Sequence, residues 1–398
     1  MTNLDLKAPT DFIGHLSLGT DTIDLTFQLH ITSSGELKLD FPKLPLNDQT
    51  AFIRMENSRG GSTYANFNLA GVANDGTRLH SDELQLTSVN WNQFEIGDER
   101  ITIEGRCSIA TLVRPCNPAM LPRLTMQLKG FANYGSLHAT CPLGKLVMNG
   151  KRRNVNADPN VLCGWVIIEA EETPPDIAIW RQDASKLLDH IRVVMSLAAA
   201  SMLKAPVRHF HFNERFEIEL WLQGTQDPDP LRIIPDMSQK TIFQAAVSSF
   251  FSPPIKAVNF NFAVEWFAMN ASYNETRLAN AMTALENLVN SNLDDSVTFI
   301  QPQKIFEKTT RPAMRKLIRA CVERWDTEDA TNVLAEMNEK LSDLNRRSLA
   351  RKIAILSERA RTGPWRPGLP VRGDHRFRWM TTTCSGRWRP GQQGCGRA

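Results

Sequence analysis

The stretch that decides the fold is TIDLTFQLHI, residues 22 to 31. Five apolar residues alternate in it with polar ones: Ile23, Leu25, Phe27, Leu29 and Ile31. Side chains of a β-strand point to opposite faces with a period of two, so the stretch predicts a strand with one buried face. The turn TSSGE follows, and the alternation resumes over residues 37 to 41, which predicts a hairpin partner.

Short runs of the same kind recur to about residue 170, among them ELQLTSV, RITIEGRCSI and GWVIIEAE. Turns that contain glycine or asparagine separate many of them, and no helical pattern lies between them. Many short strands without helices favour an antiparallel sandwich or barrel-like module. We therefore expect an antiparallel β sandwich-like domain over residues 1–175.

Residues 176–254 are expected to connect this domain to a second one. Pro174 and Pro175 end the last strand, and a helical pattern runs from about 177 to 204. The stretch RHFHFNERFEIELWLQG then returns to alternation and predicts a strand with a row of phenylalanines. His209 and His211 share the other face, where they are either a metal-ligating pair or, as we favour, surface residues.

Residues 255–362 predict a small bundle of four amphipathic helices. Apolar residues recur there every three or four positions, as in Leu278, Met282, Leu285 and Val289. The chain as a whole is therefore expected to be α+β, with the strands first and the helices second.

Charge is distributed unevenly along the chain. The net charge is +3, but the 38 residues from 361 carry eight arginines and one acidic residue, or +7, which leaves −4 for residues 1–360. Overall charge therefore gives no argument that the folded body binds nucleic acid. Seven cysteines without close pairing indicate a reducing cytoplasm, and no apolar run is long enough to cross a membrane.

Several kinds of active site have no motif in this chain. There is no phosphate-binding glycine loop, no dinucleotide fingerprint and no serine-hydrolase elbow. Cys107 and Cys116 are separated by eight residues, which does not match the close spacing of zinc ligands. We expect neither a metal nor a cofactor.

The helical part contains the segments SYNETRLANAMTALENLV, RPAMRKLIRACVERW and LSDLNRRSLARKIAILSERA. A resemblance to the HEPN domains of ApeA-like proteins rests on these three segments. Within them, Tyr273, Arg277 and Ala284-Leu285-Glu286 precede an L-N-x-x-S segment at residues 344–348. The order of a β module, a connecting helix and the aromatic stretch FAVEWFAMN agrees as well, so the resemblance covers most of residues 10–362.

This resemblance implies a dimeric, metal-independent endoribonuclease of an antiphage (abortive infection) or toxin-like system, acting on tRNA or another cellular RNA. HEPN enzymes carry an R-x(4–6)-H motif on a late helix. In such a motif the imidazole moves the proton of the 2′-hydroxyl, and the guanidinium stabilises charge on the scissile phosphate. The resemblance also implies a homodimer formed through the HEPN helices.

The catalytic motif itself is missing. His375 is the one histidine in residues 255–398, and the arginines before it, Arg372 and Arg366, are separated from it by two and eight residues. Glu286, Arg372 and His375 are thus weak catalytic candidates, and the stretch around His375 is too rich in proline and glycine for a helix. This copy is expected to be catalytically impaired.

The last segment, residues 363–398, changes composition abruptly. It is rich in Arg, Gly, Pro and Trp and lacks lysine, glutamate and isoleucine. We interpret it as a disordered tail or the product of a reading-frame change that replaced the genuine HEPN sequence. The nucleotide sequence tests this, because another frame should then encode a helix with R-x(4–6)-H. An RNA-binding tail is the alternative.

Four basic residues, Arg346, Arg347, Arg351 and Lys352, are candidates for contacts with RNA phosphates, or else form a solvated helix face. Asn345 and Ser348 are expected to cap the last helix. The alternative to a ribonuclease is a non-enzymatic protein, in which the β module binds a ligand or partner and the helices form a dimer.

Overall fold

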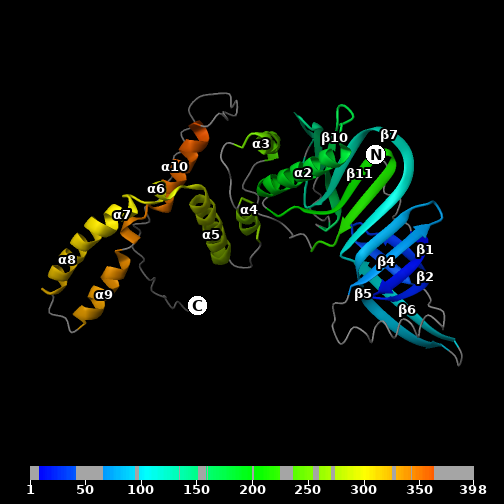
Figure 1. The fold of residues 1–398 in the computed structure, drawn as a ribbon, viewed down its shortest axis with the longest axis horizontal. Helices are drawn as coiled ribbons and strands as arrows, with labels where there is room; N and C mark the ends of the chain where they lie inside the picture. Colours follow the sequence, from blue (N-terminus) through cyan, green and yellow to red (C-terminus); the bar gives the residue numbers. More distant parts are fainter. Residues whose placement is uncertain are drawn as a thin grey trace, which may run out of the picture. The chain divides into compact units, whose positions relative to one another are not determined.

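The computed structural model confirms the α+β expectation, with strands in the N-terminal half and helices α4 to α10 in the C-terminal part (Figure 1). It describes residues 9–41, 66–94, 98–133, 135–150, 158, 160–199, 201–224, 236–253, 260–269, 274–324, 329–341 and 343–362. The tail from residue 363, including Arg372 and His375, lies outside the described residues, as does Tyr273.

The first six strands close into a ring. They are β1 (Thr10–Leu18), β2 (Asp21–Ile31), β3 (Leu37–Phe41), β4 (Phe67–Ala73), β5 (Arg78–Phe94) and β6 (Asp98–Cys107). Their order is β4-β1-β2-β3-β6-β5, and β4 also pairs with β5, so every strand has two neighbours. All these pairs are antiparallel. The module is therefore a closed ring rather than two stacked sheets, and closure leaves these strands without an unpaired edge.

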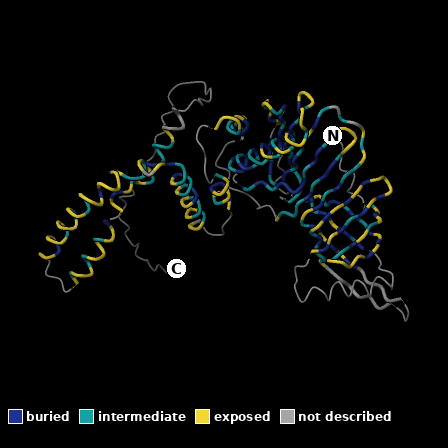
Figure 2. Tube along the Cα trace, viewed as in Figure 1, coloured by how far each residue is buried: buried dark blue, intermediate teal, exposed yellow. Residues whose placement is uncertain are grey.

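The interior of the ring is an apolar core built by alternation. In β2 all five apolar residues of the TIDLTFQLHI stretch are buried, as predicted. Figure 2 shows buried and exposed positions alternating along the ring strands. Phe27 lies at the centre, with its ring centroid 5.4 Å from that of Phe12 and 5.6 Å from that of Phe41. The period-two pattern therefore fixes which side chains fill the ring.

Two long strands join the ring to a second sheet. They are β7 (Ile109–Lys129) and β11 (Lys204–Trp221), which pair along most of their length. Residues 111–113 of β7 pair with β5, and residues 123–129 pair with β10 (Leu162–Glu169). The sheet continues through β9 (Gly144–Gly150) to β8 (Leu137–Cys141). Residues 204–221, expected to lie in a connecting segment, are thus part of the β structure.

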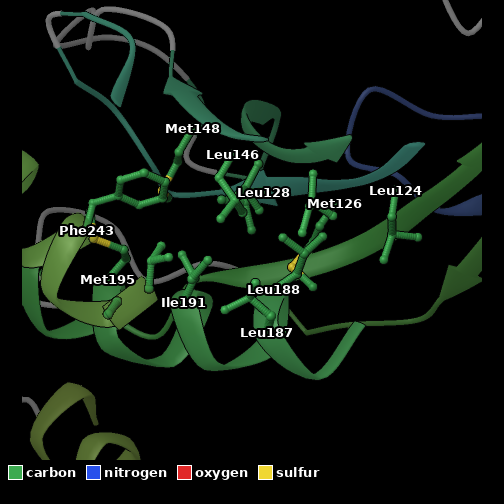
Figure 3. Packing of buried hydrophobic residues seen from close by; sticks show 14 of the residues in the cluster. Leu124, Met126, Leu128, Leu146, Met148, Leu187, Leu188, Ile191, Met195 and Phe243 are labelled. Carbon is green, nitrogen blue, oxygen red and sulfur yellow. The ribbon is translucent and has the colours of Figure 1, made fainter. Parts of the chain in front are cut away.

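Helices α2 (Ile177–Ala199) and α3 (Gln239–Phe251) pack against this second sheet. Figure 3 shows Leu187, Leu188 and Ile191 of α2 facing Leu128 and Met126 of β7. Phe243 of α3 and Leu146 and Met148 of β9 extend the same core. The 3–4 spacing of apolar residues that predicts the helix therefore supplies its buried face.

Strand β11 changes the face of its side chains at Asn213. This residue has φ of 51°, and the pairing register with β7 shifts on both sides of it. Before it, Phe210 and Phe212 pack with the core under α2, whereas Phe216 after it packs with the ring core. The prediction of a single row of phenylalanines is therefore wrong. Because of the irregularity at Asn213, even-numbered residues before it and even-numbered residues after it lie on opposite faces of the strand.

The left-handed backbone at Asn213 makes a testable prediction. We expect Asn213→Val to lower the free energy of unfolding by about 1–2 kcal/mol, because a β-branched side chain is strained at positive φ. Asn213→Gly should change it by less than about 1 kcal/mol, because glycine adopts this conformation without strain. Urea unfolding followed by circular dichroism measures both, and equal losses in the two variants would refute the strain argument.

The C-terminal part consists of helices that form mostly as predicted. They are α4 (Phe260–Ala268), α5 (Asn274–Asn292), α6 (Asp295–Thr298), α7 (Gln303–Ile305), α8 (Arg311–Val322), α9 (Ala330–Lys340) and α10 (Leu349–Thr362). A π-helical turn over Phe306–Thr310 joins α7 to α8, and short 3-10 turns span Asp236–Ser238 and Asp343–Asn345.

The helices of the C-terminal part bury some residues of their apolar stripes and expose others. Helix α5 contacts α4 and α10, and α8 contacts α9. Leu278 is 65% exposed and Leu317 is 67% exposed, while Val289 and Leu341 are buried. Figure 2 shows α8 and α9 exposed along much of their length. The C-terminal region is therefore helical, as expected, and the four-helix bundle stays a prediction.

Candidate functional site

Two of the three segments that carry the HEPN resemblance meet where α10 packs against α5, and the third forms α8. Nζ of Lys352 in α10 donates a hydrogen bond of 2.9 Å to Oδ1 of Asn290 in α5. Lys352 is 7% exposed, so it holds two helices together and is not part of a surface patch. Glu286, on the same helix as Asn290, is exposed. The structure brings Glu286 and Lys352 to one helix pair but leaves the carboxylate in solvent.

The other three predicted RNA-binding residues differ in their surroundings. Nε of Arg347 donates a hydrogen bond of 3.0 Å to the carbonyl of Phe299, which commits that side chain to the fold. Arg346 and Arg351 are exposed. Nε of Arg346 lies 3.9 Å from Oδ1 of Asp343. An ion pair this long between two exposed side chains contributes little to stability. Two cations of the four therefore remain available to a partner.

The L-N-x-x-S segment, residues 344–348, anchors the start of α10. Asn345 is 3% exposed, and its side chain exchanges two hydrogen bonds of 2.9 Å with the backbone N–H and C=O of Gln301. It is thus a tertiary clamp and not a helix cap, which corrects the expectation for this residue. Ser348 does act at the helix start, accepting a hydrogen bond of 3.4 Å from the N–H of Arg351.

Removal of the clamp should loosen this junction. We expect Asn345→Ala to lower local stability by about 2 kcal/mol, because the N–H and C=O of Gln301, both partly buried, lose their partner. Hydrogen exchange should then speed up at the Gln301 amide. The exposed Asp343→Ala variant is the control and should leave that amide protected; equal exchange in both variants would contradict the clamp.

His209 and His211 share a face, as predicted, but His209 is not a surface residue. It is 7% exposed, and its ring lies 5.3 Å from that of Phe216, centroid to centroid. Burial lowers the pKa of His209 to about 4, so the imidazole is neutral at pH 7. His211 also contacts Phe216, and its Nε2 lies 3.2 Å from the carbonyl oxygen of Asn117. No group of three metal-ligating side chains gathers among the described residues.

A groove lies between α2 and β11, on the face that β11 presents to α2. Its volume is about 730 Å³. The residues that line it are Ile177, Ala178, Arg181, Gln182, Ser185, Lys186, Asp189, Phe210, Phe212, Asn213, Arg215 and Glu217. The size falls within the range of small-molecule sites in proteins.

A charged network lies along one side of this groove. Arg181 of α2 donates hydrogen bonds to Glu217 and to Glu219, and the contact with Glu219 is 2.8 Å. Its guanidinium carbon also lies 4.6 Å from the centroid of the Phe210 ring. Nearby, Arg208 makes two hydrogen bonds of 2.7 Å to the carboxylate of Asp189. These paired charges fasten α2 to β11 and fix the wall of the groove.

Sequence reasoning did not find this groove. The alternating charges of RFEIEL signal that one face of the strand is polar. They do not reveal that the face change at Asn213 turns this polar face toward α2. The partner Arg181 lies 36 residues before Glu217 in the chain, and no local pattern links the two.

No helix in the described part of the chain is both long and apolar enough to span a membrane. Comparisons of this chain with models of known protein families, with curated proteins and with solved structures find no match.

Proposed function

We propose that this chain is a HEPN-type protein directed to RNA, of the kind found in antiphage or toxin-like systems, with impaired catalysis. The observation that carries the proposal is the packing of α10 on α5 through Lys352 and Asn290. These helices hold two of the three segments on which the resemblance rests. The proposal includes a cytoplasmic location, a homodimer formed through the helices, and tRNA or another cellular RNA as the target.

The chemistry of the described residues agrees with impaired catalysis. Metal-independent cleavage of RNA needs a group that takes the proton of the 2′-hydroxyl and a cation that stabilises the phosphate. Arg346 and Arg351 supply exposed cations beside the α5–α10 pair. Glu286 is the carboxylate predicted for this site, and residues 255–362 contain no histidine. We infer that RNA is bound at this helix pair and that its hydrolysis is slow.

Incubation of the full chain with tRNA in EDTA tests both parts of the proposal. We expect tRNA to be retained by the protein in a filter-binding assay and to stay largely intact on a denaturing gel. Rapid cleavage to 2′,3′-cyclic phosphate ends would overturn the impaired catalysis, and absence of binding at low salt would overturn the RNA-directed function.

A second candidate function is non-enzymatic binding of a ligand or partner by the β module. The groove between α2 and β11 favours it, because its lining combines aromatic side chains with a fixed charged network. The two functions are compatible in one chain, since the groove and the α5–α10 pair are made by different elements.

A further inference from the structure

The floor of the α2–β11 groove is aromatic. Phe210 and Phe212 line it, and Phe210 is 7% exposed with Arg181 over its ring. Phe212 is only partly buried and packs at the margin of the core beneath α2. A flat ring placed on Phe212 would therefore gain stacking contact without displacing core residues.

The wall of the groove contains a buried carboxylate, one oxygen of which can still accept a hydrogen bond. The side chain of Glu217 is 7% exposed, and its Oε1 accepts a hydrogen bond from Arg181. Its Oε2 lies 2.9 Å from Nη2 of Arg215 as an ion pair, but it receives no aligned hydrogen bond. A buried carboxylate oxygen in this state favours a ligand that brings an N–H donor.

Two exposed cations stand at the rim of the groove. Lys186 of α2 is 55% exposed and lies 3.1 Å from Asp183, and Arg215 of β11 is 62% exposed and lies 2.9 Å from Glu217. The lining holds three basic and two acidic side chains, and Asp183 and Glu219 pair with two of the basic ones. An anionic group would therefore bind at the exposed ends of Lys186 and Arg215 in exchange for these ion pairs.

The backbone at the groove is in an uncommon conformation. Asn213 lines the groove, and it is the one residue other than glycine with positive φ in the described part of the chain. Its left-handed conformation produces the face change that turns Glu217 and Arg215 toward α2. Local strain that serves to place side chains in a groove is common at binding sites.

We propose that this groove binds a purine mononucleotide, with the base on Phe212, a base N–H donated to Oε2 of Glu217, and the phosphate between Lys186 and Arg215. Nucleotides combine a flat ring, a hydrogen-bond donor and an anion, which are the three features that the groove accommodates. The site is separate from the helix pair to which RNA binding is assigned, so this inference goes beyond the proposed function.

Titration calorimetry of the full chain with AMP and GMP tests the inference. We expect at least one of them to bind with a dissociation constant below about 1 mM, and adenosine or guanosine to bind about tenfold more weakly. Ribose 5-phosphate, which lacks the base, should give no measurable binding. Equal binding of ribose 5-phosphate and the nucleotides would overturn the inference, as would no nucleotide binding at all.

Three variants locate the site. Arg215→Gln should weaken nucleotide binding about tenfold more than nucleoside binding, because the guanidinium holds the phosphate that the nucleoside lacks. Phe212→Leu should weaken both about tenfold, because it removes the stacking surface. Arg78→Gln, a change of an exposed arginine on β5, is the control and should change neither. Circular dichroism checks that each variant is folded.

The result also has to be separated from RNA binding. Arg346→Glu with Arg351→Glu should leave nucleotide binding intact, and Arg215→Gln should leave tRNA binding intact. Nucleotide binding that is lost in the Arg346 and Arg351 variant but kept in Arg215→Gln would place the nucleotide on the helices and overturn the assignment to the groove. Failure of the RNA experiments alone leaves this inference standing.

Discussion

Phe27→Ala should lower the free energy of unfolding by about 3–5 kcal/mol, the cost of removing a large aromatic side chain from a packed core. Phe27 is 1% exposed and contacts the rings of Phe12 and Phe41 at the centre of the closed ring. Urea unfolding measures the loss. The same substitution at Phe262, which is 41% exposed on α4, should cost far less.

Substitution of Gly71, which lies against Phe27, gives a second test of this packing. A Cβ added to Gly71 would lie 2.7 Å from the Phe27 ring, so Gly71→Ala alone should cost about 1–3 kcal/mol through overpacking. In the Phe27→Ala background the same methyl enters the space that the phenyl group has left, so the loss of stability caused by Gly71→Ala should nearly vanish. Additive effects of the two substitutions on the free energy of unfolding would show that the Phe27 side chain does not fill the interior of the six-stranded ring.

The second large expected effect is the loss of folding stability at low pH that buried His209 causes. The pKa of His209 is lowered to about 4 by burial, from 6.5 for an ordinary histidine. Because the unfolded chain then binds a proton that the folded chain excludes, stability is fully present above pH 6.5 and is lost as pH falls toward 4. From pH 7.5 to pH 4.5 we expect this one group to remove about 2–3 kcal/mol of the free energy of unfolding.

His209→Leu should remove this part of the pH dependence. Nε2 of His209 has no hydrogen-bond partner, so an apolar side chain of similar size leaves no donor or acceptor unsatisfied. Urea unfolding at pH 7.5 and 4.5 compares the variant with the wild type. His138→Leu, at an exposed position of β8, is the control and should keep the full pH dependence. An unchanged pH dependence in His209→Leu would contradict a buried neutral imidazole.

The sequence predicts the individual strands of this chain better than it predicts how the first six strands close into a ring. Alternation in TIDLTFQLHI identifies the strand and its buried face, since side-chain direction follows from the period alone. The pairing of β4 with β5, which closes the ring, depends on contacts between segments that no period reveals. The sandwich-like expectation therefore identified several of the strands, including β2 with its buried face, but missed β1, β8 and β9 and the pairing that closes the ring.

Asn213 and Asn345 show a second limit. Asparagine within an alternating stretch looks like an ordinary polar residue, yet the positive φ of Asn213 reverses the faces of β11 after it. The L-N-x-x-S pattern suggests a helix cap, whereas Asn345 bonds Gln301, 44 residues away. Both depend on backbone conformation or distant partners, which residue spacing does not encode.

Binding of tRNA to charge-reversal variants tests the central claim most directly. The double variant Arg346→Glu with Arg351→Glu should weaken tRNA binding by the full chain at least about tenfold. The slope of the logarithm of the binding constant against the logarithm of salt concentration should fall by the equivalent of about two phosphate contacts. Arg78→Glu with Arg106→Glu changes the same charge at exposed positions of the ring and should have little effect. Equal weakening by both pairs, or binding lost only on removal of residues 363–398, would contradict recognition of RNA by the α5–α10 helix pair.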